Sequence, residues 1–132
     1  LSRRACRQPS CGKHGHMVEL TTSAIGGSAE RRVASWYRRR GWRWCAHNWI
    51  GGGGELDLVF SRWTTLLIVE VRLRATAQAA RGSVDDEKLK RVLGATAALV
   101  RTHGLQCYRL RVDLATVDHR GRIAVSRDLL RA

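Results

Sequence analysis

Residues Gly54–Arg74 read GELDLVFSRWTTLLIVEVRLR and place two carboxylates inside some of the most apolar sequence of the chain. Asp57 lies between two leucines, and Glu70 lies between two valines. Successive residues of a strand alternate between its faces, so we expect each carboxylate to point away from its aliphatic neighbours. A carboxylate in mid-strand is costly unless it is paired, hydrogen-bonded or bound to a cation. The stretch therefore predicts two strands that carry a polar site.

The two predicted strands cover Glu55–Ser61 and Thr65–Arg74, and the short connection between them fits a hairpin. Asp57 and Glu70 then lie on its two arms, and Arg72 shares the face of Glu70 because it follows two residues later. Two converging carboxylates suit a hard cation such as Mg²⁺ or Mn²⁺. A basic side chain beside them can hold a phosphate. This combination is typical of metal-assisted phosphodiester hydrolysis.

The sequence around the hairpin predicts a single α/β domain over residues 28–132. Its elements are a helix from Ser28 to about Gly41, a strand over 42–50, a turn at Gly51–Gly54, the hairpin, a loop over Ala75–Gly82, a helix from Ser83 to about Gly104, strands over Cys107–Val117 and Arg122–Val125, and a helical turn from Ser126. This order predicts a mixed sheet covered by helices. The glycine turn lacks the Lys-Ser/Thr of a phosphate-binding loop.

Residues 1–27 differ from the rest of the chain. They are rich in Arg, Ser, Gly and His without apolar periodicity, so we expect a disordered basic arm. Met17 is the only methionine of a chain that begins with Leu, and a natural start near Met17 is one expectation.

The charge balance favours a polyanionic partner. The chain has 24 Lys and Arg against 11 Asp and Glu, a net charge of +13. Nucleic acid, bound through its phosphates, is the simplest partner. Ribosomal RNA or an anionic membrane surface would also attract such a chain. No apolar run is long enough to span a membrane, Leu66–Val71 included. Four cysteines without the spacing of a disulfide framework favour a reduced, cytoplasmic protein.

Tryptophans interleave with arginines near the first predicted strand. We expect Trp36 and Trp49 in the core, and the sequence leaves open whether Trp42 and Trp44 pack there or stack on bases. Further on, Asp113 lies among arginines and is predicted to be an ion-pair partner rather than a metal ligand.

Several motifs occur together in this order: Glu30 in the first helix, Asn48, GELDLV at 54–59, VEVR at 69–72, Lys88 at the start of the second helix and RVDL at 111–114. With them the chain resembles, from about Ser28 to Val117, the PD-(D/E)xK nuclease superfamily. That superfamily has a restriction-endonuclease-like core of helix, three strands, helix and strand. The closest resemblance is to the small bacterial YraN-type family of predicted endonucleases, which is similar to archaeal Holliday-junction resolvases.

The resemblance implies roles for individual residues. Asp57 and Glu70 would be the ligands of Mg²⁺ or Mn²⁺, with the Val71 carbonyl as a further ligand. Glu30 would lie at the edge of the site, acting through water or on a second ion. From the residues alone, Glu30 is instead a solvated carboxylate favoured by the helix dipole, and the whole cluster has a structural ion-pair network as its alternative.

Arg72 departs from the superfamily pattern, which has lysine at this position. An arginine can orient phosphate and stabilise charge, but it effectively cannot lose a proton. Lys88 could partly substitute if the start of its helix approaches the site.

Two functions follow from the resemblance. The first is a Mg²⁺-dependent endonuclease that acts on structured or branched DNA. The alternative is a non-catalytic nucleic-acid-binding protein that keeps the nuclease fold, and Arg72 motivates it. A junction-resolvase relative also implies a homodimer, because a two-fold substrate suits a two-fold protein.

Overall fold

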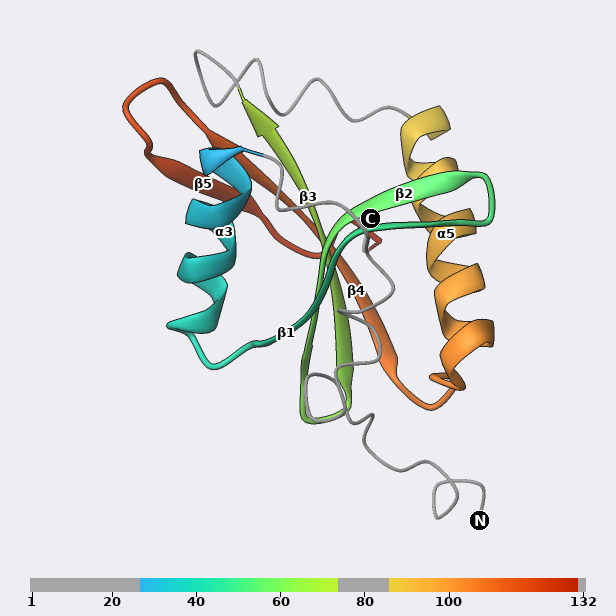
Figure 1. Cartoon of the computed structure of the whole chain (residues 1–132). Coiled ribbons are helices and arrows are strands. Elements are labelled where there is room, and N and C mark those ends of the chain that lie inside the picture. The colour runs from blue at the N-terminus through green and yellow to red at the C-terminus, as the bar shows by residue number, and fades with distance from the viewer. Residues whose placement is uncertain (1–26, 74–85, 131–132) are drawn as a thin grey trace.

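The computed structural model describes residues 27–73 and 86–130. The elements in chain order are α3 (Ser28–Arg38), β1 (Arg43–Gly51), β2 (Gly54–Arg62), β3 (Thr65–Leu73), α5 (Asp86–His103), β4 (Arg109–Val117) and β5 (Ile123–Ser126) (Figure 1). The predicted basic arm, apart from Gly27, and the predicted loop after β3 lie outside the described residues, as does the predicted helix cap at Ser83.

The strands form one five-stranded mixed sheet in the order β1-β2-β3-β4-β5. Strands β3 and β4 pair in parallel, and the other neighbours pair antiparallel. The parallel pair requires a crossover, which α5 provides. The prediction of an α/β, restriction-endonuclease-like core of helix, three strands, helix and strand is confirmed, with β5 as an added edge strand. The predicted helical turn from Ser126 is wrong, because Ser126 ends β5 and residues 127–130 form no helix.

The two helices cover opposite faces of the sheet (Figure 1). The cluster under α5 includes Leu56, Leu66, Ile68, Val92 and Leu99. The cluster under α3 includes Val33, Tyr37, Leu58, Phe60, Leu67 and Val69. Each large side chain buried in this way contributes about 1.5–3 kcal/mol. Since Leu66 and Ile68 of β3 face α5, alternation along the strand turns Glu70 and Arg72 to the same face.

Glycines set α5 close to the β1–β2 hairpin. A Cβ atom added at Gly54 would lie 2.5 Å from the carbonyl oxygen of Arg91, and one at Gly52 would lie 2.4 Å from that of Gly94. These approaches require the absence of a side chain. They hold the N-terminal half of α5 against the strand that carries Asp57.

The structure tests the expectation that Trp36 and Trp49 lie in the core. Trp49 is buried as predicted, and Trp36 is partly buried against the α3 cluster. Cys45 is buried, and its thiol lies 3.5 Å from the Ser61 hydroxyl. Among the described residues, no helix is long and apolar enough to cross a membrane.

Candidate functional site

Strands β2 and β3 separate at the two predicted metal ligands. Their pairing runs from Arg62 opposite Thr65 to Leu58 opposite Val69 and ends there. Beyond this point β2 bends toward α5 while β3 continues away from it (Figure 1). Asp57 and Glu70 are the next residues on the two strands, so their side chains lie in the fork between them.

Side chains replace the missing ladder bonds in this fork. The Asp57 N–H donates to Glu70 Oε2 at 3.3 Å, and the Val71 N–H donates to Asp57 Oδ2 at 2.9 Å. A carboxylate that accepts backbone N–H bonds from the opposite strand is held in one position. The fork therefore places two carboxylates side by side with little freedom to move apart.

A local irregularity explains why Asp57 turns into the fork. Leu56 packs under α5 and Leu58 packs under α3, although residues two apart on a regular strand share a face. The alternation is broken at Asp57, opposite the part of β1 where Asn48 adopts a φ of 51°. Asparagine is one of the few residue types that tolerate this left-handed conformation. The simple expectation that Asp57 points away from both leucines is therefore wrong in its geometry.

Two basic side chains line the fork. Arg72 places one guanidinium nitrogen, Nη1, 3.8 Å from Asp57 Oδ2. The same nitrogen donates to the Val71 carbonyl at 2.9 Å, which is the carbonyl predicted as a further metal ligand. Lys88, at the start of α5, places Nζ 3.6 Å from Glu70 Oε1. The helix start does approach the site, as its predicted role required.

Burial makes the negative charge of this pair expensive. Burial, followed by repulsion from Asp57, raises the pKa of Glu70 from 4.5 to about 7. Burial also raises the pKa of Asp57, against the lowering effects of the Val71 N–H and of the charges on Arg72 and Lys88. The two protein cations thus only partly offset the desolvation of the carboxylates. A further cation would stabilise their ionised forms.

The donor set fits a divalent metal ion. Glu70 Oε1 is buried and accepts no hydrogen bond from any described residue. Each carboxylate uses one oxygen for a backbone N–H, which leaves the other for a cation. In the described part of the chain no three His, Cys, Asp or Glu residues gather as a metal site. The protein ligands would therefore be two carboxylates with a carbonyl, the sparse oxygen set that suits Mg²⁺, which keeps several waters.

The structure brings together Asp57, Glu70, Arg72 and Lys88, whereas Glu30 comes from α3, the helix on the opposite face of the sheet from α5. Glu30 lies partly buried in the first turn of α3. Its Oε1 atom is buried. Its role at the edge of the site stays a prediction.

A second buried carboxylate has a structural partner. Arg111 forms a two-pronged ion pair with the fully buried Asp113 at 3.0 and 2.9 Å, which confirms the ion-pair prediction for Asp113. The Tyr37 hydroxyl donates to the same carboxylate at 2.7 Å. No local pattern points to this third member, since Tyr37 comes from a helix 76 positions earlier in the chain.

Comparison with known proteins places this architecture in a family. The model of the family described as "Uncharacterised protein family UPF0102" matches residues 29–117. A UPF0102 protein of Rhizorhabdus wittichii is 35% identical over 92 residues, 70% of this chain and 78% of the relative. One from Dinoroseobacter shibae is 39% identical over 101 residues, 76% of this chain and 75% of the relative. One from Parasynechococcus marenigrum is 34% identical over 112 residues, 84% of each chain.

Proposed function

The chain belongs to the UPF0102 family of the PD-(D/E)xK nuclease superfamily, and we propose that it is a metal-dependent endonuclease that hydrolyses phosphodiester bonds in structured or branched DNA. The observation that carries the proposal is the fork between β2 and β3. There, backbone N–H groups hold Asp57 and Glu70 side by side, and Glu70 keeps a buried oxygen that accepts no hydrogen bond from the described residues.

In this proposal the residues of the fork bind a metal ion and a phosphate of the substrate. Asp57, Glu70 and the Val71 carbonyl hold Mg²⁺ or Mn²⁺. The ion, when bound, supplies Lewis-acid polarisation of the phosphate and lowers the pKa of a water. Arg72 reaches across the same space and is placed to contact a phosphate oxygen. The Lys88 ammonium lies 3.6 Å from Glu70 Oε1, and its charge favours the ionised form of that carboxyl.

The basic surface of the chain supports a nucleic-acid substrate. With a net charge of +13, long-range attraction favours phosphate backbones. Such binding releases counterions, so we expect the affinity for DNA to fall steeply with salt. Charge does not select DNA over RNA, and the DNA assignment follows from the superfamily.

One contact favours the second candidate, a nucleic-acid-binding protein without turnover. Arg72 donates to the Val71 carbonyl and lies near Asp57, so a fixed cation already occupies part of the space that a metal would use. Arginine also cannot act as a base. The fold and the basic surface would then serve binding alone.

A cleavage assay separates the two candidates. Purified protein is incubated with a four-way junction, a flap and single-stranded DNA, each with Mg²⁺, Mn²⁺ or EDTA. The endonuclease predicts a metal-dependent product that Asp57→Ala and Glu70→Ala abolish. Glu55→Gln is the matched control, because Glu55 is an exposed acid two residues from Asp57 on the same strand.

Two other outcomes of these assays would favour a different function. Binding without a product under any metal condition, unchanged by Asp57→Ala or Glu70→Ala, supports the non-catalytic protein. Tighter binding of RNA than of DNA of matched length and structure would overturn the DNA assignment.

A further inference from the structure

A second built surface lies where α3 ends and β1 begins, away from the fork. α3 ends near three consecutive arginines, and Gly41, with a φ of 90°, turns the chain into β1. Residues 31–54 contain six arginines and no acidic residue. We call this surface, together with the neighbouring β2–β3 turn, the arginine–tryptophan end. Its members are Arg38, Arg40, Trp42, Arg43, Trp44, Arg62 and Trp63.

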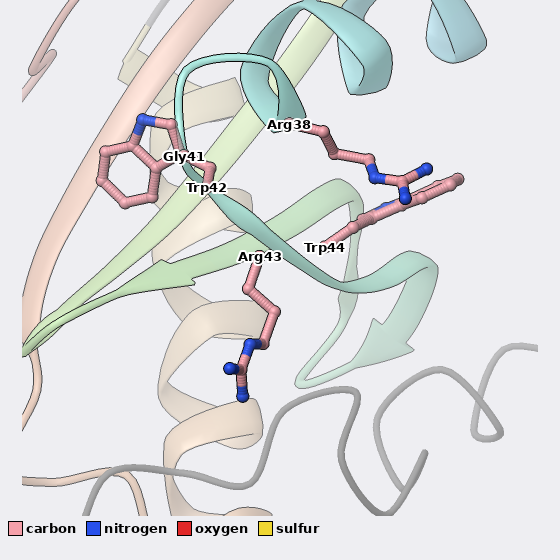
Figure 2. A pocket seen from close by; sticks show the side chains of 5 residues that line it. All are labelled: Arg38, Gly41, Trp42, Arg43 and Trp44. Atoms are coloured by element: carbon pink, nitrogen blue, oxygen red, sulfur yellow. The ribbon is translucent and has the colours of Figure 1, made fainter.

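A pocket of about 500 Å³ opens on this surface. It is lined by Arg38, Gly41, Trp42, Arg43 and Trp44 (Figure 2). In Figure 2 the side chains of Arg38 and Trp44 extend to the same side, away from Trp42. Trp44 is partly exposed, whereas Trp42 is only 6% exposed. The pocket thus presents one accessible indole beside arginine side chains.

The surrounding arginines are stacked and fixed. The Arg62 guanidinium lies 4.0 Å from the centroid of the Trp42 ring and donates to the Arg40 carbonyl at 2.9 Å. The Arg40 guanidinium lies 3.6 Å from the Trp36 centroid. Trp42 therefore packs in the core and is not available to stack on a base. Trp44, which is only partly buried, is the remaining candidate for base stacking.

The stability of the fold does not explain an exposed tryptophan at position 63. It sits in the two-residue turn between β2 and β3, is 78% exposed and has a φ of 55°. Two-residue hairpin turns favour Asn, Asp or Gly at positive φ, and a bulky residue there is unusual. Backbone strain of this kind tends to persist where a residue has a function. Trp63 follows directly after Arg62, whose guanidinium stacks on Trp42.

We propose that the arginine–tryptophan end binds an unpaired, single-stranded segment of nucleic acid. Bases stack on Trp44 and Trp63, and phosphates bind Arg38 and Arg43. Aromatic faces beside cations suit unpaired bases of any sequence, because every base has a π face. An acidic peptide would use the cations and leave the indoles without a role. This inference rests on the proposed function in taking the ligand to be a nucleic acid.

The arginine–tryptophan end lies on the α3 side of the sheet, at a short distance along β2 from the fork. Arg43 lies opposite Ser61 of β2, and Asp57 is four residues further along that strand. At ~3.3 Å per residue the separation along the strand is about 13 Å. The fork opens on the α5 side of the sheet, so a strand that occupies both sites would pass around the sheet edge at β1.

The test compares single-stranded with duplex binding in EDTA, where no cleavage occurs. Fluorescence anisotropy measures the affinity of the full chain for labelled oligo(dT) of about 15 nucleotides and for a blunt duplex of the same length. We expect Trp44→Ala and Trp63→Asn each to weaken oligo(dT) binding about fivefold or more, and duplex binding less than about twofold. Arg38→Gln with Arg43→Gln should weaken oligo(dT) binding more than the charge-matched pair Arg120→Gln with Arg122→Gln, in the exposed β4–β5 turn.

Trp63→Asn also separates binding from folding. Asparagine is favoured at positive φ, so its thermal midpoint should equal or exceed that of the wild type while oligo(dT) binding falls. Equal loss of single-stranded and duplex binding in the tryptophan variants would overturn the proposal. So would displacement of oligo(dT) by polyglutamate at equal charge concentration, which would indicate a site for acidic polymers. Because the assay uses EDTA, a chain that never cleaves DNA can still pass it.

Discussion

Asp57 and Glu70 are locked to each other across the fork, since the Asp57 N–H donates to the Glu70 carboxylate at 3.3 Å. The return bond comes from Val71, whose N–H donates to the Asp57 carboxylate at 2.9 Å. Neither carboxylate can leave without breaking a bond to the opposite strand. Two buried acids held this close are stable as a neutral or cation-bound pair and strained as a doubly charged one.

The first prediction concerns stability against pH in the absence of metal. The pKa of Glu70 is raised from 4.5 to about 7, so the folded chain favours the protonated carboxyl. The charged form therefore lowers the free energy of unfolding above about pH 7, and this penalty disappears as the pH falls toward 4.5. Relative to Glu70→Gln, the wild type should gain on the order of 2–3 kcal/mol between about pH 8 and pH 5.

Urea unfolding of both proteins at several pH values, in EDTA, measures this difference. Lys88 and Arg72 face Glu70 in both proteins, so the comparison reports the Glu70 carboxyl together with its repulsion of Asp57. Parallel pH profiles for the two proteins would contradict a raised pKa at this position.

The second prediction concerns Arg72→Lys. The substitution removes the guanidinium that donates to the Val71 carbonyl. Lysine restores the superfamily pattern and, unlike arginine, can lose a proton. We expect metal-dependent cleavage to increase roughly tenfold or more. Arg91→Lys, the same change on an exposed part of α5, should have no effect. Unchanged cleavage with metal still bound would show that the arginine does not limit turnover.

The third prediction concerns the packing of the hairpin on α5. In Gly54→Ala the new Cβ atom meets the Arg91 carbonyl oxygen at 2.5 Å, so the helix must shift. The free energy of unfolding should fall by about 1–3 kcal/mol. Gly53→Ala is the control for backbone strain alone, because Gly53 has a φ of 81° and open space around it. Thermal or urea unfolding compares the two, and a loss within about 0.5 kcal/mol for Gly54→Ala would refute the close approach of β2 and α5.

The fourth prediction concerns the buried Asp113. Tyr37→Phe removes the hydroxyl that donates to this carboxylate at 2.7 Å, while Arg111 and the Asp128 N–H remain. A bond to a charged acceptor is worth about 1.5–3 kcal/mol, so the free energy of unfolding should fall by that amount. Urea unfolding measures it. A change within about 0.5 kcal/mol would mean that the hydroxyl is dispensable.

The strand positions and the acid pair could be predicted because they rest on local pattern. The apolar run that predicts a strand over Thr65–Arg74 corresponds to β3, which ends at Leu73. Alternation along this strand correctly predicts that Glu70 turns away from its valine neighbours, which pack under α3. The hairpin then brings Asp57 opposite, as its sequence spacing requires.

The remaining features of the site depend on contacts that no local pattern encodes. The reversal of alternation at Asp57 occurs opposite a strand in which Asn48 adopts a positive φ that its residue type permits but does not require. The approach of Lys88 to Glu70 depends on how closely α5 packs against Gly52 and Gly54. The hydrogen bond from Arg72 to the Val71 carbonyl depends on the rotamer that the arginine side chain adopts.

The central claim, that Asp57 and Glu70 hold a divalent cation, is tested most directly by calorimetric titration of Mn²⁺ into the purified protein at about pH 8. Wild type and Glu55→Gln should bind Mn²⁺ with the same stoichiometry and affinity. Asp57→Asn combined with Glu70→Gln should lose that binding while keeping a folded circular dichroism spectrum. Absence of Mn²⁺ binding in the wild type, or equal binding in the double variant, would contradict the account.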